Sequence, residues 1–196
     1  MNKVKQLKAL GMGMSLPFWG AMAFSLPSAI AVLSPSAAQS LQLADGTVSF
    51  AQAPQLLKAS TPHIGAAFRG ADYYFTFRIP EDAGEPLQQL TFAQRKGLEQ
   101  IDFRLGPTRA YPSRQRKQSI ALVATTDAQQ QTTVRFDEPI LPGETITISL
   151  KAKRNPNLGG VYLFGVTAFP AGEKAQGQFL GYGRLHFFRA GGGGRG

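Results

Sequence analysis

Hydrophobic and polar residues alternate with a period of two over several stretches, and this pattern most limits the folds open to the chain. In residues 73–79, one side carries Tyr73, Phe75, Phe77 and Ile79, and the other carries Tyr74, Thr76 and Arg78. Similar alternation covers residues 101–105, 132–136 and 145–150. Because successive side chains of a strand point to opposite faces, each stretch predicts a β-strand with one buried face.

Two later segments, residues 161–169 and 179–188, are apolar at odd and even positions alike. Such strands lie in the middle of a sheet or under loops, and Gly165, Gly181 and Gly183 favour bulges or close backbone contacts. Further strands are expected near residues 48–52, 63–69, 87–94 and 120–126. Residues 85–100 fit either a helix or a strand, and the alternation around Thr91 favours a strand.

Proline, glycine and asparagine cluster between these segments, at residues 44–46, 80–84, 141–143, 155–157 and 170–172. About ten short strands separated by such turns, without a convincing amphipathic helix, are typical of a two-sheet all-β domain. The sequence therefore predicts an antiparallel β-sandwich that is immunoglobulin-like in general architecture.

The first 38 residues have the pattern of a secretory signal peptide. Lys3, Lys5 and Lys8 precede an uncharged run over residues 9–32, and Ser36-Ala37-Ala38 predicts cleavage between Ala38 and Gln39. The alternative is a retained membrane anchor, since about 20 apolar residues span a bilayer. Cleavage predicts one sandwich domain over residues 39–190, a flexible glycine-rich tail over residues 191–196 and no transmembrane span in the mature chain.

Removal of this leader would also change the composition. It takes 38 of the 196 residues, all four methionines and three lysines, so the formal charge falls from +9 to +6. The chain has no cysteine, which excludes disulfides, thiol catalysis, Cys-ligated zinc and iron–sulfur clusters. Without sulfur ligands a copper site is also disfavoured. We expect an exported protein of the periplasm, cell surface or extracellular space, with no cofactor.

Residues suited to catalysis are scarce. His63 and His186 have no metal-ligand spacing, and no Gly-x-Ser-x-Gly nucleophile turn occurs. Acidic residues cluster at predicted strand ends, at Glu81, Asp82, Glu85, Asp137 and Glu138. They fit solvated turns best, with a weak calcium site or a pair of glycosidase carboxylates as alternatives. The sequence predicts a protein that is not an enzyme and has no metal site.

Basic residues give the clearest hint of a binding site. No acid occurs between Asp102 and Asp127, and a second basic cluster follows residue 150. The candidate binding residues are Arg104, Arg109, Tyr111, Arg114, Arg116, Lys117, Lys151, Lys153 and Arg154. If loops gather them at one end of the sandwich, they would bind an anionic polysaccharide, a lipid head group or a protein. The alternative is a solvated loop that maintains solubility, and export argues against nucleic acid as a physiological partner.

Four motifs carry a resemblance to a known family. They are LADGTV at residues 43–48, PEDAGEPL at 80–87, GVYLFGVTAFPAGE at 160–173 and GQFLGYGRLHF at 177–187. Together with Arg154-Asn155-Pro156, they resemble a family of exported cyanobacterial proteins of unknown function, over residues 41–188. The resemblance implies cyanobacterial origin, export and a β-rich domain. The family has no assigned reaction, cofactor or catalytic residue, so it supplies no site.

These observations favour an exported, non-catalytic module that binds a component of the cell envelope. Two alternatives remain open. One is a glycan-processing enzyme that uses the carboxylates of Asp82, Glu85, Asp137 or Glu138, and two of these facing each other in one pocket would support it. The other is a structural subunit of a surface assembly, joined by pairing of edge strands.

Overall fold

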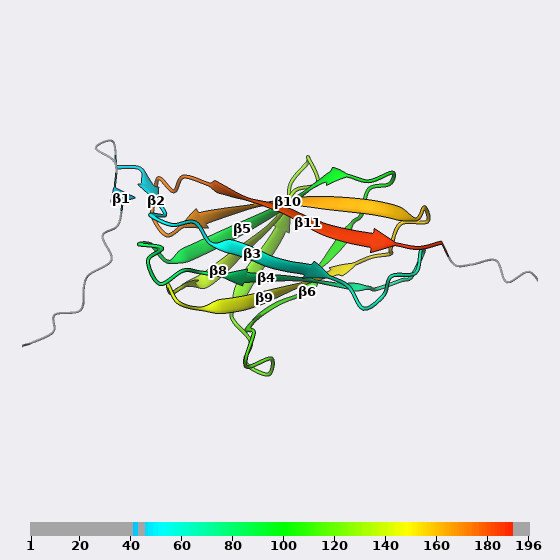
Figure 1. Ribbon diagram of the computed structural model, residues 1–196, viewed down its shortest axis with the longest axis horizontal. Coiled ribbons are helices and arrows are strands. Elements are labelled where there is room, and N and C mark those ends of the chain that lie inside the picture. The colour runs from blue at the N-terminus through cyan, green and yellow to red at the C-terminus, as the bar shows by residue number, and fades with distance from the viewer. Residues whose placement is uncertain (1–40, 43–45, 190–196) are drawn as a thin grey trace, which may run out of the picture. The chain divides into compact units, whose positions relative to one another are not determined.

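The computed structural model describes residues 41–42 and 46–189, which contain eleven strands and no helix (Figure 1). The short strands β1 (Leu41–Gln42) and β2 (Val48–Ser49) pair with each other. The other nine strands form two antiparallel sheets. The predicted signal peptide and the predicted glycine-rich tail lie outside the described residues. In the part that is described, no helix is long and apolar enough to cross a membrane.

The larger sheet has five strands in the order β11-β10-β5-β8-β7. Their bounds are β5 Leu87–Lys96, β7 Leu122–Thr126, β8 Thr132–Ile140, β10 Gly160–Pro170 and β11 Gln178–Phe187. The smaller sheet has the order β3-β4-β9-β6, with bounds β3 Gln55–Ser60, β4 Asp72–Arg78, β6 Phe103–Pro112 and β9 Thr145–Ala152. This arrangement confirms the predicted all-β antiparallel sandwich, immunoglobulin-like in general architecture.

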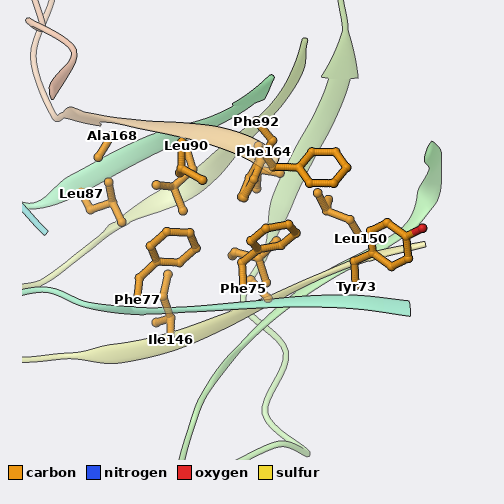
Figure 2. Close-up of a cluster of buried hydrophobic side chains, with 14 of the residues drawn as sticks. Tyr73, Phe75, Phe77, Leu87, Leu90, Phe92, Ile146, Leu150, Phe164 and Ala168 are labelled. Carbon is orange, nitrogen blue, oxygen red and sulfur yellow. The ribbon is translucent and has the colours of Figure 1, made fainter. Parts of the chain in front are cut away.

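The core lies between the two sheets and is rich in aromatic rings (Figure 2). The inner face of β4 supplies Tyr73, Phe75 and Phe77, all fully buried as the alternation predicts. Phe75 packs against Phe92 of the opposite sheet with ring centroids 4.9 Å apart. Burial of such rings removes large apolar areas from water, so this layer supplies most of the driving force for folding.

One glycine shows how closely the sheets approach. A Cβ on Gly183 of β11 would lie 2.6 Å from the ring of Phe75, which is closer than real carbon atoms pack. The ring therefore occupies the space that a side chain at this position would need. This confirms the expected close backbone contact at one of the three glycines.

Main-chain hydrogen bonds also join the two sheets at both sides. Phe188, just after β11, donates to the carbonyl of Ile64 and accepts from the amide of Ala66, each at 2.8 Å. On the other side, Ile120 before β7 donates to the carbonyl of Ala110 in β6 at 2.8 Å. The bond to Ala110 occupies part of the β6 edge, which leaves less of it for pairing with a strand of another molecule, whereas the bonds of Phe188 lie beyond the ends of β3 and β11.

Near the N-terminal side, one predicted strand was wrong and one observed strand was not predicted. Residues 63–69 form a loop, although Ile64, Ala66 and Phe68 alternate as in a strand. The preceding strand, β3, was missed because a bulge between Leu56 and Lys58 interrupts its alternation. A bulge adds one residue to one strand, so apolar residues no longer recur every second position.

Two other segments settle questions that the sequence left open. Residues 85–100 contain β5, a strand, rather than a helix. The arginine-rich segment that was expected to be a loop is largely strand β6, which runs to Pro112. Only residues 113–119 form the basic loop, and it projects beyond the four-stranded sheet (Figure 1).

Candidate functional site

The solvent-facing side of the four-stranded sheet carries basic and tyrosine side chains around two adjoining hollows. One hollow has a volume of about 350 Å³ and the other about 300 Å³. Tyr74, Tyr111 and Arg116 line both of them. We call this surface the basic face, and its members are Lys58, Ser60, Asp72, Tyr74, Thr76, Arg109, Tyr111, Arg116, Thr147, Ser149 and Lys151.

Strand register arranges most of these side chains in rows across the sheet. One row contains Ser60, Tyr74, Ser149 and Arg109, and the next contains Lys58, Thr76, Thr147 and Tyr111. A third row pairs Asp72 with Lys151 and Lys151 with Arg104. Side chains directly opposite on neighbouring strands lie about 5 Å apart, so each row is a continuous line of contacts.

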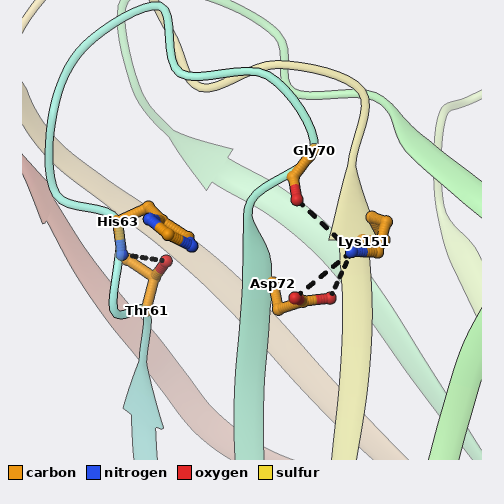
Figure 3. Close-up of polar contacts among 5 residues, drawn as sticks. All are labelled: Thr61, His63, Gly70, Asp72 and Lys151. Atoms are coloured by element: carbon orange, nitrogen blue, oxygen red, sulfur yellow. Dashed lines mark hydrogen bonds and ion pairs between the residues drawn. The ribbon is translucent and has the colours of Figure 1, made fainter.

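Lys151 is fixed at the end of the face where β4 begins (Figure 3). Its Nζ lies 3.1 Å from Oδ1 and 3.2 Å from Oδ2 of Asp72, and it donates to the carbonyl of Gly70 at 3.4 Å. Asp72 is the only acidic residue among those that line the two hollows. The face thus combines four basic side chains with one carboxylate that is already paired.

Hydroxyl groups form the floor of the face. The Thr147 hydroxyl lies 3.0 Å from that of Thr76 and 2.9 Å from that of Ser113, at the start of the basic loop. Thr147 and Ser149 are each 7 % exposed, so the floor is shielded by the longer side chains around it. The Thr147–Ser113 contact ties the base of the loop that carries Arg116 to the sheet.

The two tyrosines share one electrostatic environment. Partial burial raises the pKa of Tyr74 and of Tyr111, and the charge of Asp72 raises each further. The Arg116 guanidinium acts on both pKa values in the opposite direction, because a cation stabilises a phenolate. Both phenols therefore remain neutral donors at neutral pH, with the cation of Arg116 close to each.

The structure brings together four of the nine residues that the sequence nominated: Arg109, Tyr111, Arg116 and Lys151. Arg104 lies beside Lys151 in the register of β6 and β9. Arg114 and Lys117 are exposed on the basic loop and line neither hollow. Lys153 and Arg154 lie beyond the end of β9, where the Lys153 ammonium is 3.5 Å from the Asp102 carboxylate.

The expected location was therefore wrong, because the cluster occupies a sheet face and not loops at one end of the sandwich. The reason is that β6 is a strand, so Arg109 and Tyr111 project from the same side. Lys58 and Asp72 were not predicted as binding residues, because the residues around them in the sequence form no binding pattern. Tyr74 could have been found, since the alternation of β4 already placed it on the outer side.

The face has groups that bind anions but no assembled catalytic set. Guanidinium groups match the paired oxygens of carboxylate, sulfate and phosphate, and lysine adds a point charge. Neither histidine belongs to it: His63 stacks on Phe68 with ring centroids 3.9 Å apart, and His186 lies 4.3 Å from Phe188. Within the described residues, no group of three or more acidic, histidine or cysteine side chains could hold a metal ion.

A third hollow, of about 720 Å³ and away from the basic face, is acidic. The carboxylates of Asp137, Glu138 and Glu144 line it, above an apolar floor that includes Ile120 and Ile140. All three carboxylates are exposed, whereas a glycosidase buries one carboxyl to keep it protonated. The two other acids considered in the sequence, Asp82 and Glu85, lie in the turn between β4 and β5 and do not line this hollow.

Comparison with known protein families shows which family the chain belongs to. A family described as "Protein of unknown function (DUF2808)" matches residues 47–187. The chain belongs to this family. Its members share no assigned activity in that description, and no curated protein matches the chain in sequence.

Solved structures show the fold alone. The DUF2808 chain is similar to the major pilin subunit BcpA of Bacillus cereus, with 9 % identity and a TM-score of 0.48, over 70 % of this chain and 41 % of the pilin. BslA, a bacterial hydrophobin, gives 12 % identity and a TM-score of 0.41, over 70 % of this chain and 99 % of BslA. A collagen-binding domain from a Staphylococcus aureus adhesin gives 8 % identity and a TM-score of 0.34, over 61 % of this chain and 87 % of that domain. The chain thus spans about two fifths of the pilin.

Proposed function

We propose that this protein is an exported, non-catalytic binding module whose basic face holds an anionic polysaccharide of the cell envelope. The observation that carries the proposal is the convergence of Arg109, Arg116 and Lys151 around Tyr74 and Tyr111. Export is supported by the signal-like pattern of residues 1–38. Binding without catalysis is supported by the absence of a nucleophile–base pair among the residues that line the face.

The extent of the face favours a chain-like ligand over a single small ion. Basic groups of the face lie on three of the four strands and on the basic loop, from Lys58 on β3 to Arg109 on β6. Three strand spacings of about 4.8 Å separate these two strands, so the face is about 14 Å wide. A polysaccharide with carboxylate or sulfate groups offers repeated charges over such a length, and tyrosine rings offer flat apolar surfaces to sugar rings.

The test is binding to alginate, dextran sulfate and uncharged dextran over a series of salt concentrations. We expect binding to the two anionic polymers, weakening steeply as salt rises because counterions screen exposed charges. The double variant Arg109→Gln/Arg116→Gln should lose about tenfold or more in affinity. The matched control, Arg135→Gln/Arg184→Gln, removes two arginines from the other sheet and should bind as the wild type does.

Three results would overturn the proposal. They are equal binding to uncharged dextran, no binding to either anionic polymer, and equal losses in the two double variants. The last would mean that net charge, and not the basic face, attracts the polymer.

The alternative of glycan processing is tested at the acidic hollow, where Asp137 and Glu138 lie although both are exposed. An enzyme of this kind would release reducing ends from envelope glycan, and Asp137→Asn and Glu138→Gln would each abolish the release. Retention of activity in both variants would exclude these carboxylates as the catalytic pair.

A further inference from the structure

Several loops meet at the end of the sandwich where β11 ends (Figure 1), and they carry exposed apolar side chains. Ten large hydrophobic residues are exposed among those that the structure describes, and five of them lie in the loops at this end: Ile64, Phe68, Leu98, Leu158 and Phe188. Leu98 is 73 % exposed and Phe188 52 %. Scattered exposed residues need no explanation, but five on neighbouring loops form an apolar patch.

Hydrogen bonds hold these loops against one another. The Glu99 carboxylate accepts from the backbone amides of Asn157 and Leu158, at 2.8 and 3.0 Å, which links the loop of Leu98 to that of Leu158. Phe188 donates to the carbonyl of Ile64 at 2.8 Å. The five apolar side chains are therefore presented by one connected set of loops.

A buried asparagine anchors the set to the core. Asn155 is 1 % exposed. Its amide donates to the carbonyls of His63 and Gly65 at 2.7 and 2.8 Å, and its oxygen accepts from the Tyr73 hydroxyl at 2.8 Å. Its backbone amide also donates to the carbonyl of Phe68 at 2.8 Å. Because the loop backbone is fixed, exposure of Ile64 and Phe68 is a property of the fold.

The same end is basic. Five cations are exposed on these loops or at their bases: Arg69, Lys96, Lys153, Arg154 and Arg189. Three acids lie there as well: Glu99 is engaged by the loop amides and Asp102 lies against Lys153. The third, Asp127, lines a hollow with Lys153 and accepts from the amides of Gln129 and Gln131 in its own turn. We call the five apolar and five basic residues together the loop end.

We propose that the loop end docks on an anionic lipid surface. Apolar side chains enter the boundary between head groups and acyl chains, while nearby Lys and Arg attract anionic head groups. A second copy of the chain fits less well, since a symmetric contact would bring ten cations together. A peptide partner fits less well too, because the side chains stand on separate loops and line none of the hollows described above.

This site is distinct from the basic face, with which it shares no residue. The two proposals can therefore fail separately. A chain that starts at Gln39 is suitable for the test, because the buried hydrophobic residues of the described chain all lie between Phe50 and Phe187. Without the preceding apolar run, any lipid binding must come from the domain itself.

The apolar part is tested by co-sedimentation with vesicles of phosphatidylcholine, with and without phosphatidylglycerol. We expect binding to the anionic vesicles only. Leu98→Ser/Leu158→Ser should weaken it at least tenfold, since each leucine loses its apolar contact with the bilayer. The matched control Val123→Ser/Leu141→Ser makes the same kind of change at exposed positions elsewhere and should bind like the wild type.

The basic part is tested with Arg69→Gln/Arg154→Gln, for which we expect a loss of about fivefold per cation. The control is Arg114→Gln/Lys117→Gln, which removes two cations from the basic loop. Circular dichroism of each variant establishes that it is folded. The proposal is overturned if neither double variant of the loop end binds anionic vesicles more weakly than its control, or if the wild type does not bind them. It is also overturned if sedimentation of the protein alone shows self-association that Leu98→Ser/Leu158→Ser abolishes.

Discussion

The strands β4 and β9 carry two very different surfaces on their two sides. Toward the core they present Tyr73, Phe75 and Ile148, which are fully buried, and toward solvent they present Tyr74, Thr76 and Lys151. The inner residues hold the sheets together through apolar contact, and the outer ones contact one another through hydroxyl and charge interactions. Stability and recognition thus reside on opposite faces of the same strands, so substitutions on each should affect different measurements.

The outer sides of the two sheets also differ. Across the five-stranded sheet, the register aligns Thr167, Thr91, Thr133 and Thr125, a row of uncharged hydroxyls. The corresponding rows of the four-stranded sheet contain arginine, lysine and tyrosine. Exposed arginines also lie on the five-stranded sheet, but its register places Arg135 opposite Gln89 and Val123, and Arg184 opposite Leu163. The two outer sides therefore differ in how closely the cations are grouped, and this grouping favours a ligand for the basic face.

The largest expected effect is on the inner side of β4. Phe75→Ala should lower the free energy of unfolding by about 3–5 kcal/mol, because it leaves a cavity among aromatic rings of both sheets. Thr76→Ala, on the outer side of the same strand, should cost about 1 kcal/mol through the lost contact with Thr147. Urea unfolding measures both, and similar values for the two variants would contradict the division of roles.

Asn155 and Asn157 test whether a buried residue also contributes more to stability than an exposed one when both are polar. Asn155→Ala should cost about 3 kcal/mol, since it leaves the Tyr73 hydroxyl and two loop carbonyls without their partner. Asn157→Ala is the matched control, because Asn157 is exposed and its side chain contacts only Glu99. A destabilisation of Asn155→Ala no greater than that of the control would show that the loop end does not depend on this anchor.

Stability at alkaline pH tests the inner face of β4 through its buried tyrosine, Tyr73. Burial raises the pKa of Tyr73 well above its ordinary value of about 10. The unfolded chain therefore loses this proton near pH 10 while the folded chain keeps it, so stability is intact below pH 10 and falls above it. The slope is up to about 1.4 kcal/mol per pH unit for each such tyrosine.

The measurement is urea unfolding at about pH 9 and about pH 11, bracketing the ordinary tyrosine pKa. Tyr73→Phe removes the titrating group and should make the loss between the two values smaller than in the wild type. An equal loss in both proteins would mean that other groups cause the alkaline destabilisation.

The fold could be predicted from the sequence wherever one face of a strand is buried. β4, β8 and β9 alternate cleanly because their inner residues meet the opposite sheet, and the expected strands match the observed ones there. β3 was not predicted because its bulge breaks the period and none of its residues is fully buried. Residues 63–69 were wrongly predicted as a strand for the opposite reason, since apolar residues alternate there although they lie in a loop that exposes them.

The site was only half predictable. Arg109 and Tyr111 were identified from composition, because a basic run without acids is visible in the chain. Their meeting with Tyr74 and Lys58 could not be identified, since it depends on the order β3-β4-β9-β6. Strand order follows from long-range packing, and a single sequence with several similar strands does not determine which ones pair.

The smallest effect on stability concerns the one acid of the basic face. Asp72→Asn removes an ion pair whose partners are about 30 % exposed, so the expected loss of stability is below about 1 kcal/mol. Affinity for an anionic polysaccharide should nevertheless increase, because the substitution removes the only negative charge of the face and frees the Lys151 ammonium. Glu85→Gln, in the turn between β4 and β5, changes the net charge equally and serves as the control in the salt series. Lower affinity of Asp72→Asn than of the control would mean that Asp72 orients Lys151 for binding, and the face would then depend on the pair and not on its net charge.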